Sequence, residues 1–196
     1  MIEPHDPDVK QTYVAFAPPE LARRMKFITA ITLVTETNQK DLPQFERLSA
    51  KNMIGVRIRQ GGATTDVLLN LLADGRIRHR NANNTLGGWE TDAYLLAITH
   101  ADGGDDSSAN AASRIFIADG SYLRRDGKVI LDSLSKVFLA VEKTGDALDV
   151  QLQGQPVINA AWRAPKKPAA VRLNGERVDA PYDAASESLT LSVRHE

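Results

Sequence analysis

The chain has 196 residues, of which 42% are hydrophobic and 25% charged, and its formal net charge is −1. This length allows one good-sized domain, or one domain with a small appended sheet, and the apolar content is too high for a disordered chain. A charge near zero excludes a global field that would attract nucleic acid or an anionic membrane. With no cysteine, the chain has no disulfide, no thiolate metal site and no cysteine nucleophile.

Residues 1–25 are predicted to form an arm, punctuated by Pro4, Pro7, Pro18 and Pro19. The first residues lack the basic and apolar regions of a signal peptide, and no apolar run approaches the length of a transmembrane helix. We therefore expect a soluble chain with no membrane partner.

Short runs rich in β-branched and alternating apolar residues fill the rest of the chain. The run over 54–59 predicts a half-buried strand with Arg57 and Arg59 on its wet face, and the run over 67–72 suits a strand better than a short helix. Strands are predicted over residues 27–34, 54–59, 67–72, 76–79, 94–99, 114–118, 122–125, 128–131, 137–141, 148–152, 171–173, 176–178 and 189–193.

Turn signals separate these runs every 8–12 residues or so, which is typical of a sandwich or of stacked sheets. The pairs are Asp74-Gly75, Asp126-Gly127, Gly145-Asp146 and Asn174-Gly175, the last being the strongest because it suits a type I′ turn. The small polar residues of 101–113 predict a mobile loop.

The predicted fold is therefore an all-β, antiparallel β-sandwich built from hairpins. We expect a main sandwich domain over 26–143 and C-terminal hairpins over 144–196 that pack on it or extend it.

Three arginines near one predicted strand are candidates for substrate binding. On a strand, Arg76, Arg78 and Arg80 share one face, and such a stripe can hold carboxylate or sulfate groups. The alternative, which we favour, is a solvated face or pairing with acidic neighbours.

The asparagine-rich segment after the stripe also resembles sugar-binding chemistry. Asn83 offers an amide for sugar hydroxyls, and Trp89 offers an indole on which a sugar ring can stack. The favoured alternative for Trp89 is interior packing at a strand entrance.

No catalytic residue and no metal site is predicted. The four histidines lack the close spacing of a metal motif, and the run Asp119-Gly120-Ser121-Tyr122 lacks the glycines and the helix of a nucleophile elbow. The Trp162-Arg163 pair suggests a cap on a sheet edge. No cofactor is expected.

Four runs resemble the C-terminal β-sheet region of heparinase II/III-like polysaccharide lyases, and the likeness spans most of residues 5–196. The runs are Gly88-Trp89-Glu90-Thr91-Asp92-Ala93-Tyr94-Leu95-Leu96-Ala97, Asp119-Gly120-Ser121-Tyr122-Leu123, Leu131-Asp132-Ser133-Leu134-Ser135-Lys136-Val137-Phe138 and Phe27-Ile28-Thr29-Ala30.

The resemblance implies a β-domain that supports an α/α toroid, an acidic polysaccharide substrate, β-elimination at a uronic acid and a periplasmic or secreted location. The toroid and the catalytic groups have no counterpart in this sequence, so we expect no activity from the chain alone. The alternatives are a free-standing carbohydrate-binding module, which would use an exposed Trp89 beside a groove, and a structural interaction domain. A broad apolar face near residues 20–34 would favour the lyase fragment.

Overall fold

The computed structural model describes residues 26–32, 37, 41–72, 84–101, 112–155 and 157–194. These ranges contain strands and no helix, so the all-β prediction is confirmed, and none of them could cross a membrane as a helix. The strands are β1 (Gln44–Ala50), β2 (Met53–Gln60), β3 (Ala63–Asn70), β4 (Asn84–Leu86), β5 (Trp89–Thr91), β6 (Leu95–Ala101), β7 (Ala112–Arg125), β8 (Lys128–Thr144), β9 (Ala147–Gln153), β10 (Val157–Arg163), β11 (Ala170–Leu173), β12 (Glu176–Val178), β13 (Tyr182–Asp183) and β14 (Ser188–Arg194).

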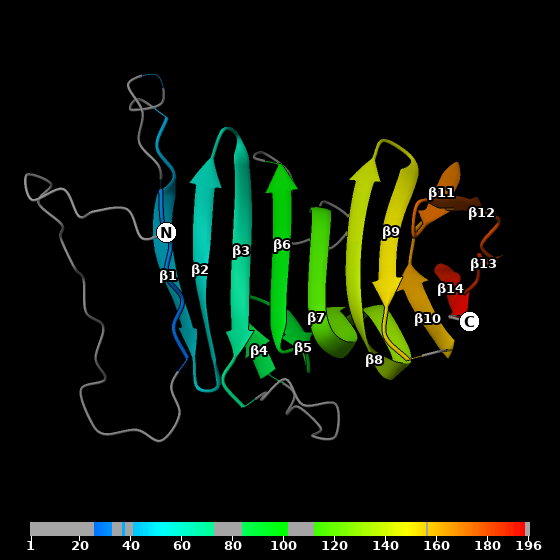
Figure 1. Cartoon of the computed structure of the whole chain (residues 1–196), viewed down its shortest axis with the longest axis horizontal. Helices are drawn as coiled ribbons and strands as arrows, with labels where there is room; N and C mark the ends of the chain where they lie inside the picture. Colours follow the sequence, from blue (N-terminus) through cyan, green and yellow to red (C-terminus); the bar gives the residue numbers. More distant parts are fainter. Residues whose placement is uncertain are drawn as a thin grey trace, which may run out of the picture.

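All of these strands belong to one hydrogen-bonded sheet with the main path β1-β2-β3-β6-β7-β8-β10-β14-β13. The long strands β7 and β8 take part in two different regions of it. The start of β7 pairs with β6 and its end with β5, while the start of β8 pairs with β10 and its end with β9. We call the region with β1, β2, β3, β6 and β9 the long layer, and the region with β4, β5, β10, β13 and β14 the short layer (Figure 1).

A bend in β7 carries the chain from one layer to the other. Its pairing with β8 shifts register on both sides of Gly120, and Asp119 has a φ of 53°. Such bulges let one strand serve two packed layers. A Cβ on Gly120 would lie 2.7 Å from the Ala93 Cβ and 2.7 Å from the Ile117 Cγ2, so the bend requires glycine.

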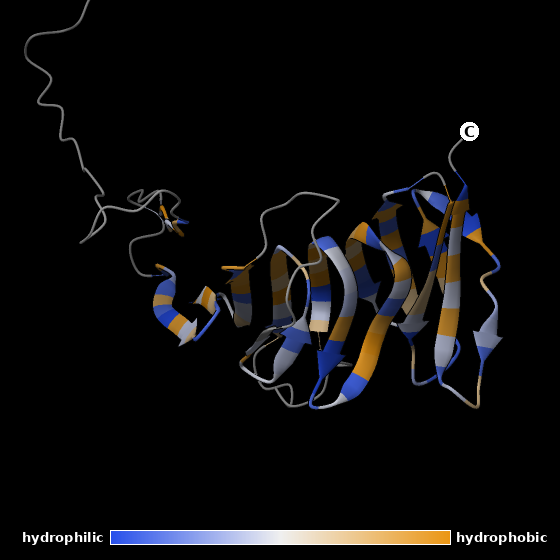
Figure 2. Cartoon of the chain, turned by 90° about the horizontal axis from the view of Figure 1, so that it is seen from below, coloured by the Kyte–Doolittle hydropathy of each residue, from blue (hydrophilic) through white to orange (hydrophobic). Residues whose placement is uncertain are grey.

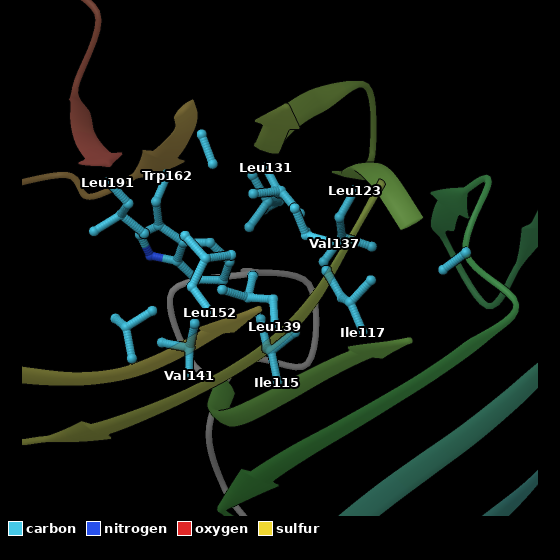
Figure 3. Packing of buried hydrophobic residues seen from close by; sticks show 14 of the residues in the cluster. Ile115, Ile117, Leu123, Leu131, Val137, Leu139, Val141, Leu152, Trp162 and Leu191 are labelled. Carbon is cyan, nitrogen blue, oxygen red and sulfur yellow. The ribbon is translucent and has the colours of Figure 1, made fainter. Parts of the chain in front are cut away.

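One hydrophobic core lies between the layers. Apolar and polar residues alternate along the strands (Figure 2), and the apolar side chains of the two layers point toward one another (Figure 3). The residues with no exposed surface include Met53, Leu96, Ile98, Ile117, Leu123, Leu131, Val137, Leu139, Val150, Leu152, Ile158 and Leu191.

The strands after residue 144 join the same sheet and the same core. β9 and β10 both pair with β8, and Leu152 and Leu191 belong to the one core cluster. These C-terminal strands therefore have no separate core of their own.

Three predicted turns are confirmed. Asp126 and Gly127 have φ values of 48° and 77°, and Asn174 and Gly175 have 54° and 89°, so both pairs have the two positive φ angles of a type I′ turn. Gly145 (φ 58°) begins the turn between β8 and β9. Asp74-Gly75 and the interior of the predicted 101–113 loop lie outside the described residues, as does the arm over 1–25.

Other predictions are wrong in detail. Residues 27–32 are not a strand: Ile31 is 82% exposed and Phe27 55%, and β-branched residues form a strand only where a partner strand is available. The runs over 114–118 and 122–125 are one strand, and so are those over 128–131 and 137–141. The sheet is not wholly antiparallel, because β9 and β11 pair in parallel.

Candidate functional site

The arginine stripe and Asn83 are not tested by the structure. Arg76, Arg78, Arg80 and Asn83 all lie outside the described residues, so their role in substrate binding stays a prediction.

Trp89 lies in the core and is only 1% exposed. The Arg125 guanidinium lies over its ring, 4.8 Å from the centroid, and the His100 ring centroid is 6.1 Å away. The favoured interpretation of interior packing is therefore confirmed. The exposed sugar platform is wrong for this indole, which offers no free face.

Asp92 organises the polar residues around the bend of β7. Its carboxylate, in a residue 6% exposed, accepts hydrogen bonds from the Ser121 N–H (2.7 Å), the Ser121 hydroxyl (2.7 Å) and the Tyr122 N–H (3.3 Å). The neighbouring Thr91 hydroxyl donates to the Tyr122 carbonyl at 2.8 Å and accepts from the Ala93 N–H at 3.0 Å. The run 119–122 is therefore a structural bend, in which the Ser121 hydroxyl donates a hydrogen bond to the Asp92 carboxylate.

Tyr122 and Asp119 extend this cluster without opening it to solvent. The Tyr122 hydroxyl is buried and finds no hydrogen-bond partner in the described structure. Burial raises the pKa of Tyr122 far above its usual range, the Glu90 and Asp92 carboxylates raise it further, and Arg124 opposes them. Asp119 lies 3.5 Å from the Lys136 Nζ. A protonated phenol and a buried ion pair suit a fixed corner better than a substrate site.

The strand β2 places its isoleucines away from the core, opposite to the prediction. Arg57 lies on the core side, where its Nε and Nη2 donate to the two oxygens of buried Asp66 at 2.7 and 2.8 Å. Ile54, Val56 and Ile58 therefore lie on the outer face of the long layer. Alternation groups the residues that share a face but does not say which face is buried.

Cross-strand register continues this apolar surface across the layer. Val56 pairs with Val67, Val67 with Ala97, Ala97 with Phe116, and Phe116 with Ala140. Cross-strand partners share one face of a sheet. We call this surface the outer apolar face; it consists of Phe45, Ile54, Val56, Ile58, Val67, Leu69, Leu95, Ala97, Phe116, Ala118, Phe138 and Ala140.

Three phenylalanines of the outer apolar face are well exposed: Phe45 at 46%, Phe116 at 41% and Phe138 at 51%. A shallow hollow lies around Phe116 and Ala140, bordered by the ion pair between Arg114 and Glu142 (2.7 Å). Exposed apolar surface of this extent marks an interaction site more often than a solvated surface.

A second hollow opens at the end of the core, between the two layers. Trp162 and Ile130 of the short layer face Ile115, Val141 and Leu148 of the long layer across it, and Figure 3 shows Trp162 on the far side of the core from Val141 and Ile115. We call it the end cavity; its volume is about 70 Å³. β10 pairs with both β8 and β14, so the predicted edge cap at Trp162 is wrong.

Charged side chains surround the mouth of the end cavity. Lys143, Arg163 and Lys166 line it together with Asp146. The Lys166 Nζ lies 2.7 Å from the Asp146 Oδ1, and Arg163 is paired with Glu187. The hydrogen bond and charge of Lys166, aided by the charge of Lys143, lower the pKa of Asp146.

The described residues contain no group of three or more histidine, aspartate or glutamate side chains placed to hold a metal ion. No protein-family model matches the chain, and no curated protein is similar enough to count as a relative. Among the described residues, the outer apolar face is therefore the feature that bears most directly on function.

The sequence alone did not predict either surface. The sequences of β2 and β3 carry a signal for the outer apolar face, because both faces of these strands hold apolar residues. One face has Met53, Gly55 and Leu68, and the other has Ile54, Val67 and Leu69. The end cavity has no such local signal, because its walls come from four strands, a turn and a loop.

Proposed function

We propose that this chain is a non-catalytic β-domain that packs through its outer apolar face on a helical domain. In line with the resemblance given above, that partner would be the α/α toroid of a heparinase II/III-like polysaccharide lyase. The β-domain would support the toroid and line one wall of a cleft for an acidic polysaccharide.

The observation that carries this proposal is the outer apolar face itself. It runs over six neighbouring strands, β1, β2, β3, β6, β7 and β8, and leaves Phe45, Phe116 and Phe138 exposed. A sheet with two apolar faces is normally covered on both. Because β2, β3, β6, β7 and β8 are paired on both sides, a partner must pack on this face and cannot extend the sheet at these strands. Packing of a helical domain on this face would bury it.

The alternative of a free-standing carbohydrate-binding module loses its main support, because it needs an exposed Trp89 and this indole is buried. What remains for it is the untested arginine stripe. The apolar face that would favour the lyase fragment is predicted near residues 20–34, whereas the outer apolar face lies on β1, β2, β3, β6, β7 and β8. Within the described part of the 20–34 segment, Phe27 and Ile31 are exposed.

The direct test is binding to a separately expressed α/α toroid domain of a heparinase II/III-like lyase, measured by co-elution in gel filtration. Phe116→Asp with Phe138→Asp should abolish co-elution, because two charges would be buried against the partner. The matched control is Val129→Asp with Leu134→Asp. These residues are 44% and 98% exposed and belong to β8, and Leu134 lies outside the register that defines the outer apolar face.

Two outcomes of this test would contradict the proposal: equal binding by both double variants, or no toroid binding by the unmodified chain. Self-association of the chain through Phe116 would also contradict it, because the partner would then be a second copy of the chain. Steady release of unsaturated uronate from heparin or alginate by the repurified chain would contradict its non-catalytic role.

A further inference from the structure

The hollow around Ala140 opens where the outer apolar face meets charged residues. Phe116 lies between two alanines, Ala97 of β6 and Ala140 of β8, which are its cross-strand partners. Small side chains on both sides of a large one leave open space above the sheet. This space, which we call the Ala140 hollow, has a volume of about 400 Å³. Small-ligand sites have volumes of roughly 300–1,000 Å³, so the hollow has room for a long side chain.

The side of the Ala140 hollow that faces away from Phe116 is acidic. Glu142 of β8 and Asp149 of β9 line it and are cross-strand partners, so the two carboxylates lie on one face of the sheet. Like charges placed directly opposite one another destabilise a sheet. Among the described residues that line the hollow, Arg114 is the one cation. One cation against two carboxylates leaves one excess negative charge.

Arg114 uses few of the acceptors in the hollow. Its Nε and Nη2 both donate to the Oε1 of Glu142, at 3.1 and 2.7 Å, and neither donates to Oε2. Asp149 and the neighbouring Gln151 are exposed, and within the part of the chain that the structure describes their side chains form no ion pair or hydrogen bond. The hollow therefore offers carboxylate and amide oxygens to a donor from outside the chain.

Arg172 of β11 is the cross-strand neighbour of Asp149 on the side away from the hollow. It does not line the hollow, and in the described structure it forms no ion pair with Asp149. Its charge weakens the negative potential of the hollow but takes up none of the acceptors. A cation that enters the hollow therefore competes with the charge of Arg172 and not with its hydrogen bonds.

A guanidinium group suits both sides of the Ala140 hollow. Its planar fork of N–H donors binds carboxylates in a bidentate manner, and it stacks on aromatic rings such as that of Phe116. The methylene stem of an arginine covers apolar surface such as Ala140. A lysine ammonium is compact and strongly hydrated, so it gains less from the apolar side.

We propose that the Ala140 hollow receives an arginine side chain from the partner that packs on the outer apolar face. The stem of this arginine lies over Ala140 beside Phe116. Its guanidinium donates hydrogen bonds to Glu142 and Asp149. The origin of the arginine in a helical partner rests on the proposed function, whereas the preference of the hollow for a guanidinium group is independent of it.

The preference of the hollow is measured with n-butylguanidinium as the probe, at constant ionic strength. Its titration should shift the backbone N–H signals of Ala140 and Gln151 in a ¹H–¹⁵N spectrum to saturation. The indole signals of Trp89 and Trp162 should stay in place, because neither residue lines the hollow. n-Butylammonium should bind about threefold more weakly, and butan-1-ol should cause no shift, because it has no charge for the carboxylates.

Variants at the hollow test the charge and the location. Asp149→Asn should weaken n-butylguanidinium binding about fivefold, the upper range for an exposed ion pair, and Arg172→Met should tighten it about twofold. Ala140→Leu should abolish binding, because it fills the hollow from its floor. The matched control is Asp132→Asn, an exposed aspartate of β8 that pairs with the short layer and should leave the affinity unchanged.

Calorimetric titration with the toroid domain tests the origin of the arginine. Asp149→Asn should weaken toroid binding about fivefold, and Asp132→Asn should not change it. Toroid binding that is unaffected by Asp149→Asn would overturn the arginine contact and leave the proposed function intact. Absence of toroid binding by the unmodified chain would contradict the proposed function and with it the origin of the arginine. The preference of the hollow is overturned if n-butylguanidinium causes no saturable shift, or if Asp149→Asn leaves its affinity unchanged.

Discussion

Two aspartates show how differently this protein uses a carboxylate. Asp92 is 6% exposed and accepts three hydrogen bonds from Ser121 and Tyr122, two of them from backbone N–H groups. Asp146 lies in an exposed turn, where it accepts a hydrogen bond from Lys166 and interacts with the charges of Lys166 and Lys143. A carboxylate held by backbone donors fixes the path of the chain, whereas one held by flexible lysines sets the charge of a surface. Asp92 therefore stabilises the fold, whereas Asp146 contributes to the charge of an exposed turn.

The largest expected effect is at the bend that Asp92 holds. Gly120→Ala should lower the free energy of unfolding by about 3 kcal/mol, since its Cβ would lie within overlap distance of Ala93 and Ile117 and would force the bend apart. Chemical denaturation followed by tryptophan fluorescence measures it. Gly127→Ala is the control: its φ is positive but it has open space, so a loss of about 1 kcal/mol is expected. Equal losses at the two positions would show that crowding at the bend is unimportant.

Asp92→Ala should cost about 2–3 kcal/mol, because it leaves two backbone donors buried without an acceptor. Asp146→Ala should leave the denaturation midpoint unchanged within error, since exposed ion pairs contribute little. Urea titration of both variants measures the contrast. If Asp146→Ala destabilises the protein as much as Asp92→Ala, the distinction between a carboxylate that holds the fold and one that only charges the surface is wrong.

The phenol of Tyr122 gives a smaller effect that depends on pH. Because its pKa is raised in the folded protein, the folded state keeps a proton that the unfolded state loses above about pH 10. Tyr122 therefore contributes stability below that pH, and this contribution falls as the pH rises above it. Ordinary tyrosines ionise near pH 10, and the tyrosinate that forms can be followed by its absorbance. In the folded protein, this absorbance change should be the same for the parent and for Tyr122→Phe, because Tyr122 stays protonated at that pH. A loss of one tyrosine's amplitude there would show that the hydroxyl reaches solvent.

The smallest effect is expected from the titration of Asp146. Its pKa is lowered in the folded protein, so the carboxylate contributes stability above its unfolded pKa, and the contribution is lost as the pH falls through the folded value. Asp146→Asn should therefore lower the melting temperature by a small margin above about pH 4, and this margin should vanish as the pH falls below that value. Lys166→Met should remove the same small margin. A difference between Asp146→Asn and the parent protein that is larger at pH 3 than at pH 7 would contradict this prediction.

The sequence predicted the turns and the fold class, because short runs of residues determine both. Asn-Gly and Asp-Gly pairs favour the two positive φ angles of a type I′ turn, and Asn174-Gly175 and Asp126-Gly127 adopt them. The all-β class follows in the same way from many short runs. The strand predicted over 27–34 is wrong for the described residues 27–32, because a strand needs a partner strand and local sequence does not specify one.

The sites depended on information that local sequence does not carry. The sequence predicts Arg57 on the wet face, but Arg57 lies on the core side, where it pairs with buried Asp66 of the neighbouring strand. Ser121 and Tyr122 were visible as part of a motif, but their partner Asp92 is 29 residues from Ser121 in the chain. Trp89 was correctly favoured as interior, because large indoles are usually well buried.

The passage of β7 and β8 through both layers has a consequence for how the molecule comes apart. Neither layer can detach while keeping its hydrogen bonds, because each contains part of both strands. The described β-structure should therefore unfold as one cooperative unit, without an intermediate in which one layer alone persists. Amide protons of β6 and β10, on opposite sides of this shared pair, should exchange with solvent at the same limiting free energy.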